Sequence, residues 1–270
     1  MAVIIGILLV AFVAGVFGSM LGVGGGIIMV PVLSLAFGVP IKTAIATSII
    51  CVIATSSMAQ TTFAARGMTN MRLGMALEVA TTVGALAGGV TAVLIDGRVL
   101  QASFAVLLFY VAWQMSRRRG DIVPTPSQVM PAAYYDPAER REVRYGVHSL
   151  PLGFVLSVAA GNVSGLLGVG GGAFKVPIMN LLMGVPLKAT IATSNLMIGV
   201  TAATSAAIFY GRGYVDPHWA VPAALGILAG ARLGPRIAIR LSARVLVVVF
   251  EVVLCVFAVL MLLRALGVGV

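Results

Sequence analysis

A glycine-broken apolar segment occurs twice in the chain, 146 residues apart. Residues 15–48 align with residues 161–194, and 18 of the 34 positions are identical. Both copies contain LGVGGG, at Leu21–Gly26 and Leu167–Gly172, followed by Val-Pro, Gly-Val-Pro-x-Lys and Ile-Ala-Thr-Ser. A chain repeated in this way folds into two similar halves that face a shared axis. Many membrane transporters build a central substrate site in this manner.

The composition shows which solvent surrounds the chain. Apolar residues make up 60% of it and charged residues 10%, whereas soluble domains have about 45–50% and about 25%. A soluble chain of 270 residues could not bury that much apolar surface in one core. We therefore expect an all-α integral membrane protein with a retained first helix.

The formal net charge of +10 does not indicate a nucleic-acid partner. Basic clusters such as Arg117–Arg119 and Arg140–Arg141 lie between apolar runs, where cations orient membrane helices. No nucleic-acid-binding motif is present. Cys51 and Cys255 fall within apolar segments, so we expect no disulfide, no metal site and no cofactor.

Apolar runs of roughly membrane-spanning length, about 20 residues, divide the chain into three parts. We predict a first transmembrane repeat over residues 1–116, a polar cytoplasmic linker over 117–148 and a second repeat over 149–270. The predicted runs are Ala2–Met20, Ile41–Ala64, Leu73–Ile95, Val99–Met115, Leu150–Leu167, Leu187–Tyr210, Trp219–Ile239 and Val245–Leu266.

A short apolar piece lies between the first and second run of each repeat, at Ile27–Phe37 and Ala173–Met183. Eleven helical residues reach about 16 Å, roughly half of the hydrocarbon thickness. We interpret both pieces as re-entrant half-helices. Each repeat then crosses the membrane three times and the repeats are inverted, whereas a fully spanning first run would make them parallel. We favour inversion because it explains the glycine breaks.

The glycine breaks are the first candidate substrate site. Consecutive glycines within lipid free backbone groups, which are tolerated only where protein or water surrounds them. Glycine also lets an oxyanion approach backbone N–H groups closely. Close helix packing is the alternative explanation. The substrate-binding glycines are expected to be Gly22, Gly24, Gly25, Gly26, Gly168, Gly170, Gly171 and Gly172.

Polar residues at the start of each following helix form a second repeated group. Hydroxyl and amide groups at this depth donate hydrogen bonds to a partly dehydrated oxyanion, although they equally join helices to one another. We assign to the substrate shell Thr47, Ser48, Thr193, Ser194 and Asn195. Gln60, Thr61, Thr201 and Thr204 are further candidates for lining a path.

Three of the charged residues within or beside apolar runs are candidates for the transport chemistry. Lys175 follows the second break, and its counterpart in the first repeat is Met29; it is a candidate for neutralising an anionic substrate. Glu78 and Glu251 lie inside apolar runs, where a carboxylate is costly. We expect either of them to couple proton movement to transport, with a headgroup location as the alternative.

Enzymatic motifs are missing from the sequence. Neither break is followed by the Gly-Lys-Ser/Thr of a nucleotide-binding loop, and no nucleophile–base pair or metal-ligand spacing is present. We therefore expect a protein that is not an enzyme.

The doubled LGVGGG-x-x-x-Val-Pro motif, followed by Gly-Val-Pro-x-Lys-x-x-Ile-Ala-Thr-Ser, resembles the TauE/SafE family of membrane transporters. The resemblance covers nearly the whole chain. It implies export, and sometimes uptake, of sulfite and organosulfonates such as sulfoacetate across the bacterial inner membrane.

Together these features predict a secondary transporter for a small sulfur-containing anion, with alternating access around a midplane site at the two breaks. An anion channel and a membrane-embedded sensor or enzyme for a sulfur compound stay open as alternatives. The solute, the direction of transport, the coupling ion and the oligomeric state are left undetermined.

Overall fold

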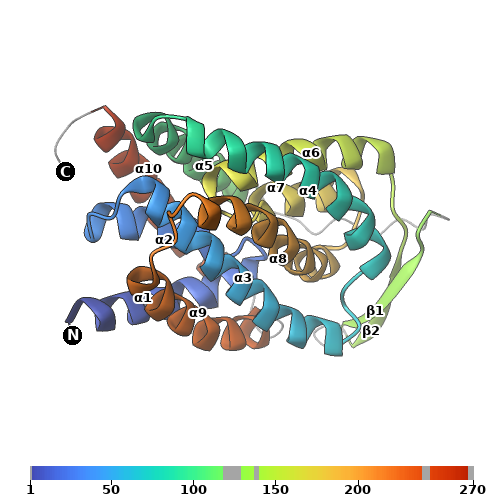
Figure 1. Ribbon diagram of the computed structural model, residues 1–270. Coiled ribbons are helices and arrows are strands. Elements are labelled where there is room, and N and C mark those ends of the chain that lie inside the picture. The colour runs from blue at the N-terminus through green and yellow to red at the C-terminus, as the bar shows by residue number, and fades with distance from the viewer. Residues whose placement is uncertain (1, 118–128, 137–139, 239–243, 267–270) are drawn as a thin grey trace.

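The computed structural model describes residues 2–117, 129–136, 140–238 and 244–266 (Figure 1). It is a bundle of helices with one small hairpin of strands at one end. The elements, in chain order, are α1 (Ala2–Leu21), α2 (Gly26–Pro31), the π-helical turn η1 (Val32–Ala36), α3 (Ile41–Ala65), α4 (Met71–Leu94), α5 (Gly97–Arg117), β1 (Ala132–Asp136), β2 (Arg141–Tyr145), α6 (Leu150–Leu167), α7 (Gly172–Pro177), the π-helical turn η2 (Ile178–Leu182), α8 (Leu187–Gly211), α9 (Pro217–Ala238) and α10 (Arg244–Ala265).

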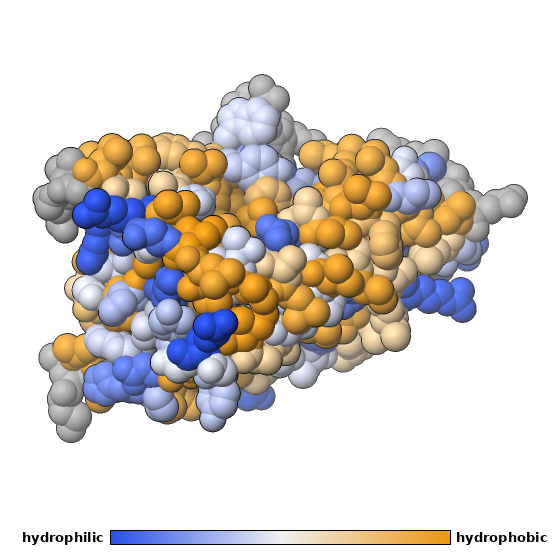
Figure 2. Space-filling model, turned by 45° about the horizontal axis from the view of Figure 1, so that its top comes forward, coloured by the Kyte–Doolittle hydropathy of each residue, from blue (hydrophilic) through white to orange (hydrophobic). Residues whose placement is uncertain are grey.

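The outer surface of the bundle is apolar, as the lipid environment requires. Along α4, large apolar side chains at helical spacing are exposed, while the opposite face of small residues is buried. Figure 2 shows broad apolar areas on one face of the molecule, with hydrophilic residues gathered mainly toward its ends. Five helices in the described residues are long and apolar enough to span a membrane: Val3–Leu21, Ile41–Ala65, Met71–Leu94, Leu150–Leu167 and Leu187–Gly211. The chain is thus an all-α multi-pass membrane protein.

Each glycine break turns the chain back on itself. The end of η1 returns to the start of α1, since a Cβ added to Gly6 would lie 3.5 Å from the Phe37 ring. The second repeat does the same, with Gly153 beside the sulfur of Met183. α1 with α2–η1, and α6 with α7–η2, therefore form two helical hairpins.

Proline determines the shape of both returning arms. Pro31 ends α2 and Pro177 ends α7, and a π-helical turn follows each of them. Proline has no N–H to donate and its ring crowds the carbonyl four residues earlier. A wider turn after the proline is one way to relieve this conflict, so the returning arms are α-helical for only six residues each.

Each major contact that a helix of the first repeat makes with the second repeat has an equivalent contact from the second repeat to the first. α1 packs on α9 and α6 packs on α4, while α3 packs on α8 and α5 on α10. α3 and α8 run in opposite directions, because Lys42 at the start of α3 lies over the ring of Tyr214, just after the end of α8, at 5.7 Å. At the other end, Phe63 of α3 shares a core cluster with Ala189 of α8. Figure 1 shows both helices crossing the centre.

Glycines allow the closest of these helix contacts. A Cβ added to Gly161 of α6 would overlap the Thr81 carbonyl of α4. A Cβ added to its counterpart, Gly15 of α1, would lie 2.5 Å from the Ile227 carbonyl oxygen of α9. Small residues permit such backbone approach in membranes, where helix association depends on van der Waals packing.

The described part of the linker is packed against the bundle, whereas we expected an exposed polar connection. β1 and β2 pair antiparallel. Tyr134 and Tyr145 are buried in the core cluster that contains Met68 and Met183. The Asp136 carboxylate accepts hydrogen bonds from Lys188 Nζ at 2.7 and 2.8 Å, which fastens β1 to the start of α8. Side chains alternate between the two faces of a strand, so Val143 and Tyr145 of β2 and Tyr134 and Asp136 of β1 lie on the buried face.

Candidate functional site

The two glycine breaks lie directly against each other at the centre of the bundle. A Cβ added to Gly26 would lie 2.7 Å from the carbonyl oxygen of Gly168, and one added to Gly172 would overlap the carbonyl oxygen of Gly22. Because only glycine fits at these positions, the breaks form the contact at which the two repeats meet.

The repeated serines hold this contact together. Ser48 Oγ donates to the carbonyl of Gly168 at 2.5 Å, and Ser194 Oγ donates to the carbonyl of Gly22 at 2.9 Å. Each hydroxyl thus binds the break of the other repeat. In the state described, both serine protons join helices, which was the alternative to substrate binding that the sequence left open.

Several glycines of the breaks are also needed for their backbone conformation. Gly24 has φ 81° and Gly170 has φ 73°, a region that other residues rarely adopt. Val52 and Ile198 pack against these turns, since a Cβ added to Gly170 would meet both side chains. The centre is therefore filled by protein in this state.

The remaining repeated polar residues differ in their partners. Thr193 Oγ1 accepts a hydrogen bond from the backbone N–H of Asn70 at 3.0 Å. Asn195 Nδ2 donates to the carbonyl of Ile191 at 2.9 Å, which leaves Asn195 Oδ1 buried and without a partner among the described residues. Thr47 Oγ1 is likewise buried and unpartnered there. Buried polar atoms without partners are uncommon, so both residues are candidates for contacts made in another state.

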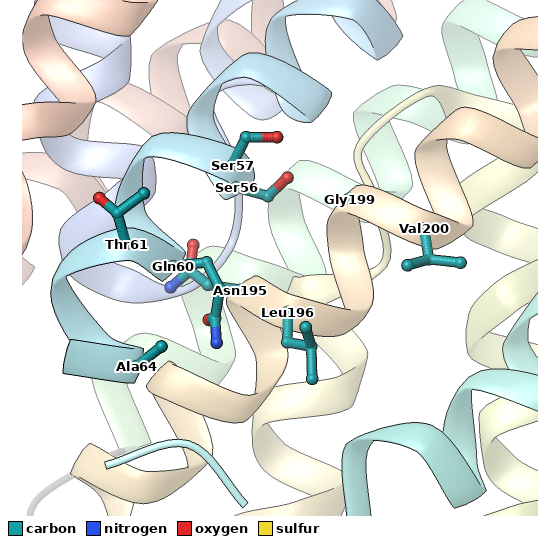
Figure 3. A pocket seen from close by; sticks show the side chains of 9 residues that line it. All are labelled: Ser56, Ser57, Gln60, Thr61, Ala64, Asn195, Leu196, Gly199 and Val200. Atoms are coloured by element: carbon teal, nitrogen blue, oxygen red, sulfur yellow. The ribbon is translucent and has the colours of Figure 1, made fainter. Parts of the chain in front are cut away.

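Asn195 also lines a cavity of about 360 Å³ between α3 and α8 (Figure 3). This volume is at the lower end of the roughly 300–1,000 Å³ of small-molecule sites. In Figure 3 the amides of Gln60 and Asn195 lie beside each other between the two helices. The cavity is lined by Ser56, Ser57, Gln60, Thr61 and Ala64 of α3 and by Asn195, Leu196, Gly199 and Val200 of α8.

A buried charge cluster joins the two repeats beside the second break. Lys175 of α7 is 1% exposed, and its Nζ lies 3.6 Å from Glu78 Oε2 of α4. Thr201 of α8 accepts a hydrogen bond from Lys175 Nζ at 2.5 Å and donates one to Glu78 Oε1 at 2.7 Å. Thr81 donates to Glu78 Oε2 at 2.9 Å. The carboxylate thus compensates the charge of the lysine.

The structure therefore separates the predicted site residues into three groups. The glycines with Ser48 and Ser194 form the central contact, Asn195 faces the cavity, and Lys175 with Glu78 forms the charge cluster. Glu251 is within α10, but its side chain lies outside the described residues.

Sequence reasoning did not single out Ser56, Ser57 or Thr81. The sequence contained a pattern that indicates a polar face on α3. Ser56, Ser57, Gln60 and Thr61 recur at helical spacing, and alanines occupy the equivalent positions in α8. In the described part of the chain, no group of three or more His, Cys, Asp or Glu residues could hold a metal ion.

Two helical hairpins whose glycine breaks meet at the centre of a multi-pass bundle define the architecture of a membrane transporter built from two similar halves. Residues 7–261 match the family described as sulfite exporter TauE/SafE. The chain belongs to this family.

Relatives across nearly the whole length carry the name of probable membrane transporters. The chain is 24% identical to the probable membrane transporter YunE of Bacillus subtilis, over 92% of this chain and 93% of that protein. It is 26% identical to a probable membrane transporter of Methanocaldococcus jannaschii, over 95% and 94%. A probable membrane transporter of Xylella fastidiosa is 27% identical, over 87% and 83%. No solved structure matches the chain. Family and relatives together indicate a membrane transporter rather than an enzyme.

Proposed function

We propose that the protein is a secondary carrier that exports a small sulfur-containing anion, such as sulfite or an organosulfonate, across the cell membrane. The observation that carries this proposal is the cavity between α3 and α8, which is lined by the amides of Gln60 and Asn195 in a member of the TauE/SafE family. The amide of Asn195 has a second N–H hydrogen that is able to donate to an oxyanion.

The central contact acts as the closed barrier in this proposal. The substrate enters the cavity from the end of the bundle that holds the β1–β2 hairpin. When the repeats move apart, Ser48 and Ser194 leave the carbonyls of Gly168 and Gly22. Their hydroxyls, with Thr47, Thr193 and the glycine amides, then bind the anion at the midplane before the opposite side opens.

We place ion coupling at Glu78, because its carboxylate is paired with the buried Lys175. Protonation of Glu78 would leave Lys175 as an uncompensated cation beside the second break, which favours an anion there. Glu251 is the second candidate for proton coupling.

Counterflow in proteoliposomes tests the proposed function. Vesicles preloaded with sulfite, sulfoacetate, taurine, thiosulfate or sulfate receive a trace of labelled solute. We expect saturable counterflow for sulfite or an organosulfonate, and we expect Asn195→Ala to reduce it about tenfold, since one charge-assisted hydrogen bond is lost. Thr204→Val is the matched control, because its hydroxyl bonds within α8 and lies on an exposed face.

Two results would contradict the proposal. Flux that rises linearly with concentration, together with single-channel conductance, would identify an anion channel. Absence of counterflow for every solute in the panel, with folded protein in the vesicles, would favour a sensor or enzyme.

A further inference from the structure

The polar residues that line the α3–α8 cavity have apolar counterparts in the other repeat, whereas the lining residue Ala64 corresponds to Tyr210. An offset of 146 residues places Ala202 and Ala203 at the positions of Ser56 and Ser57. The same offset places alanines at the positions of Gln60 and Thr61, and Ile49 at the position of Asn195. The mirrored face, at the other end of the α3–α8 pair, is thus built from Ala202, Ala203, Ala206, Ala207, Tyr210, Ile49, Ile50, Ile53 and Ala54.

The fold does not require these polar groups. α8 crosses α3 and contacts α4, just as α3 contacts α9. These equivalent contacts form although α8 has alanines where α3 has serine, glutamine and threonine. The alanines and their polar counterparts also have matching exposure, since Ser57 and Thr61 are exposed, as are Ala203 and Ala207. Polarity on one side only therefore serves a solute rather than helix packing.

Exposed polar side chains on a membrane helix need water or a carbonyl of their own helix. Thr61 donates to the carbonyl of Met58 at 2.7 Å, so Ser57 is the exposed hydroxyl that needs water. Within lipid, unsatisfied polar groups cost several kcal/mol each. Ala64 at the outer edge of the cavity is one residue from the end of α3, and Arg66 follows it. The cavity therefore extends to the aqueous boundary at the end of the bundle where Phe63 meets the linker residue Tyr145 in one cluster.

Each amide of the cavity wall has a second N–H hydrogen that is able to donate to an oxyanion, whereas its oxygen accepts only from the water of the hydration shell. Gln60 Oε1 and Asn195 Oδ1 are buried and have no partner among the described residues. Gln60 Nε2 donates to Thr69 Oγ1 at 3.0 Å and Asn195 Nδ2 donates to Ile191, which fixes the orientation of both amides. The residues that line the cavity include no charged group, so the wall offers neutral donors and acceptors to a solute that keeps part of its hydration shell.

We propose that Ser57, Gln60, Thr61 and Asn195 form a one-sided vestibule that binds the hydrated oxyanion on the linker side of the membrane. The mirrored cavity, which opens when the repeats exchange roles, is lined by alanine, isoleucine and one tyrosine, Tyr210, and binds the same solute weakly. This inference rests on the proposed transport function. It adds that the KM for the transported anion is lower on the linker face than on the opposite face.

Transport from each face tests the vestibule. Sulfite KM is measured in inside-out and right-side-out membrane vesicles, and labelling of Arg144→Cys with an impermeant maleimide identifies the linker face. The test variant combines Ser57→Ala, Gln60→Ala and Thr61→Ala, which gives α3 the residues that α8 already carries. We expect KM to rise about tenfold from the linker face and to stay within about twofold from the opposite face.

The reciprocal variant supplies the matched control. Ala203→Ser, Ala206→Gln and Ala207→Thr transfer the polar wall to α8 and should lower KM from the opposite face alone. Gln60→Ala by itself replaces the triple variant if the latter does not fold. An unchanged KM, or an equal change from both faces, would overturn the vestibule. Absence of flux in the wild-type protein would instead overturn the proposed function.

Discussion

At the residue scale, one ion pair within the bundle has no equivalent in the other repeat. Lys175 and Glu78 lie where the exchanged positions of the other repeat hold Met29 and Ala224. A buried ion pair contributes little net stability, because desolvation offsets the attraction, but removing one partner leaves an uncompensated charge. The asymmetry therefore agrees with the coupling role that we propose for this pair.

This argument makes a stability prediction. Lys175→Met should destabilise the protein by roughly 3–5 kcal/mol, because it leaves Glu78 without its cation. Adding Glu78→Ala should restore most of the loss, since the double variant has the residues of the other repeat. Apparent melting temperatures in detergent measure both effects. Equal destabilisation by the double variant would show that the pair itself supports the fold.

At the scale of elements, backbone contact between helices replaces side-chain interdigitation. α6 approaches α4 at Gly161 and α1 approaches α9 at Gly15, and in each case a Cβ would meet a carbonyl oxygen of the facing helix. Lipid supplies no hydrophobic force between helices, so the association depends on this close approach.

Substitution of these glycines should therefore separate the helices. We expect Gly161→Ala to cost about 1–3 kcal/mol or more, because the facing atom is backbone and cannot move aside alone. Gly211→Ala is the control, since no atom lies within 4 Å of its added Cβ. Thermal melting of both variants in the same detergent gives the comparison. A Gly161→Ala protein as stable as Gly211→Ala would refute the packing argument.

At the scale of the whole molecule, the exchange of contacts between repeats is the property that permits alternating access. Every major helix contact has a counterpart with the repeats exchanged, and α3 and α8 run in opposite directions. A motion that opens one end of such a bundle has an equivalent motion that opens the other.

The inverted arrangement that we favour predicts that Arg66 and Arg212 lie on opposite sides of the membrane. Both residues are exposed and follow equivalent helices. In a background with Cys51→Ala and Cys255→Ala, we expect an impermeant maleimide to label Arg66→Cys only from the cytoplasm and Arg212→Cys only from outside. Permeabilised cells, in which both should react, provide the control. Labelling of both from one side would require parallel repeats.

The sequence by itself determined that the protein lies in a membrane, that it is all-α and that it consists of two similar repeats. These features depend on the composition and on a strong internal repeat, both of which are visible in the sequence without knowledge of the tertiary contacts. The sequence also indicated the half-helices, because eleven apolar residues between glycine and proline are too short to cross the bilayer. It did not indicate the packed β1–β2 hairpin, whose Tyr134 and Tyr145 are buried only because Met68 and Met183 lie opposite them.

Only the tertiary structure decided which partner each polar residue has. Ser48 and Gly168 are 120 residues apart, as are Thr201 and Thr81, and no local pattern predicts that they meet. The two Thr-Ser pairs are identical in sequence, yet only the second is followed by a residue that lines the cavity, Asn195. Hydrogen bonds and burial depend on what the other repeat brings to the same point in space, and the packing of α3 on α8 determines that.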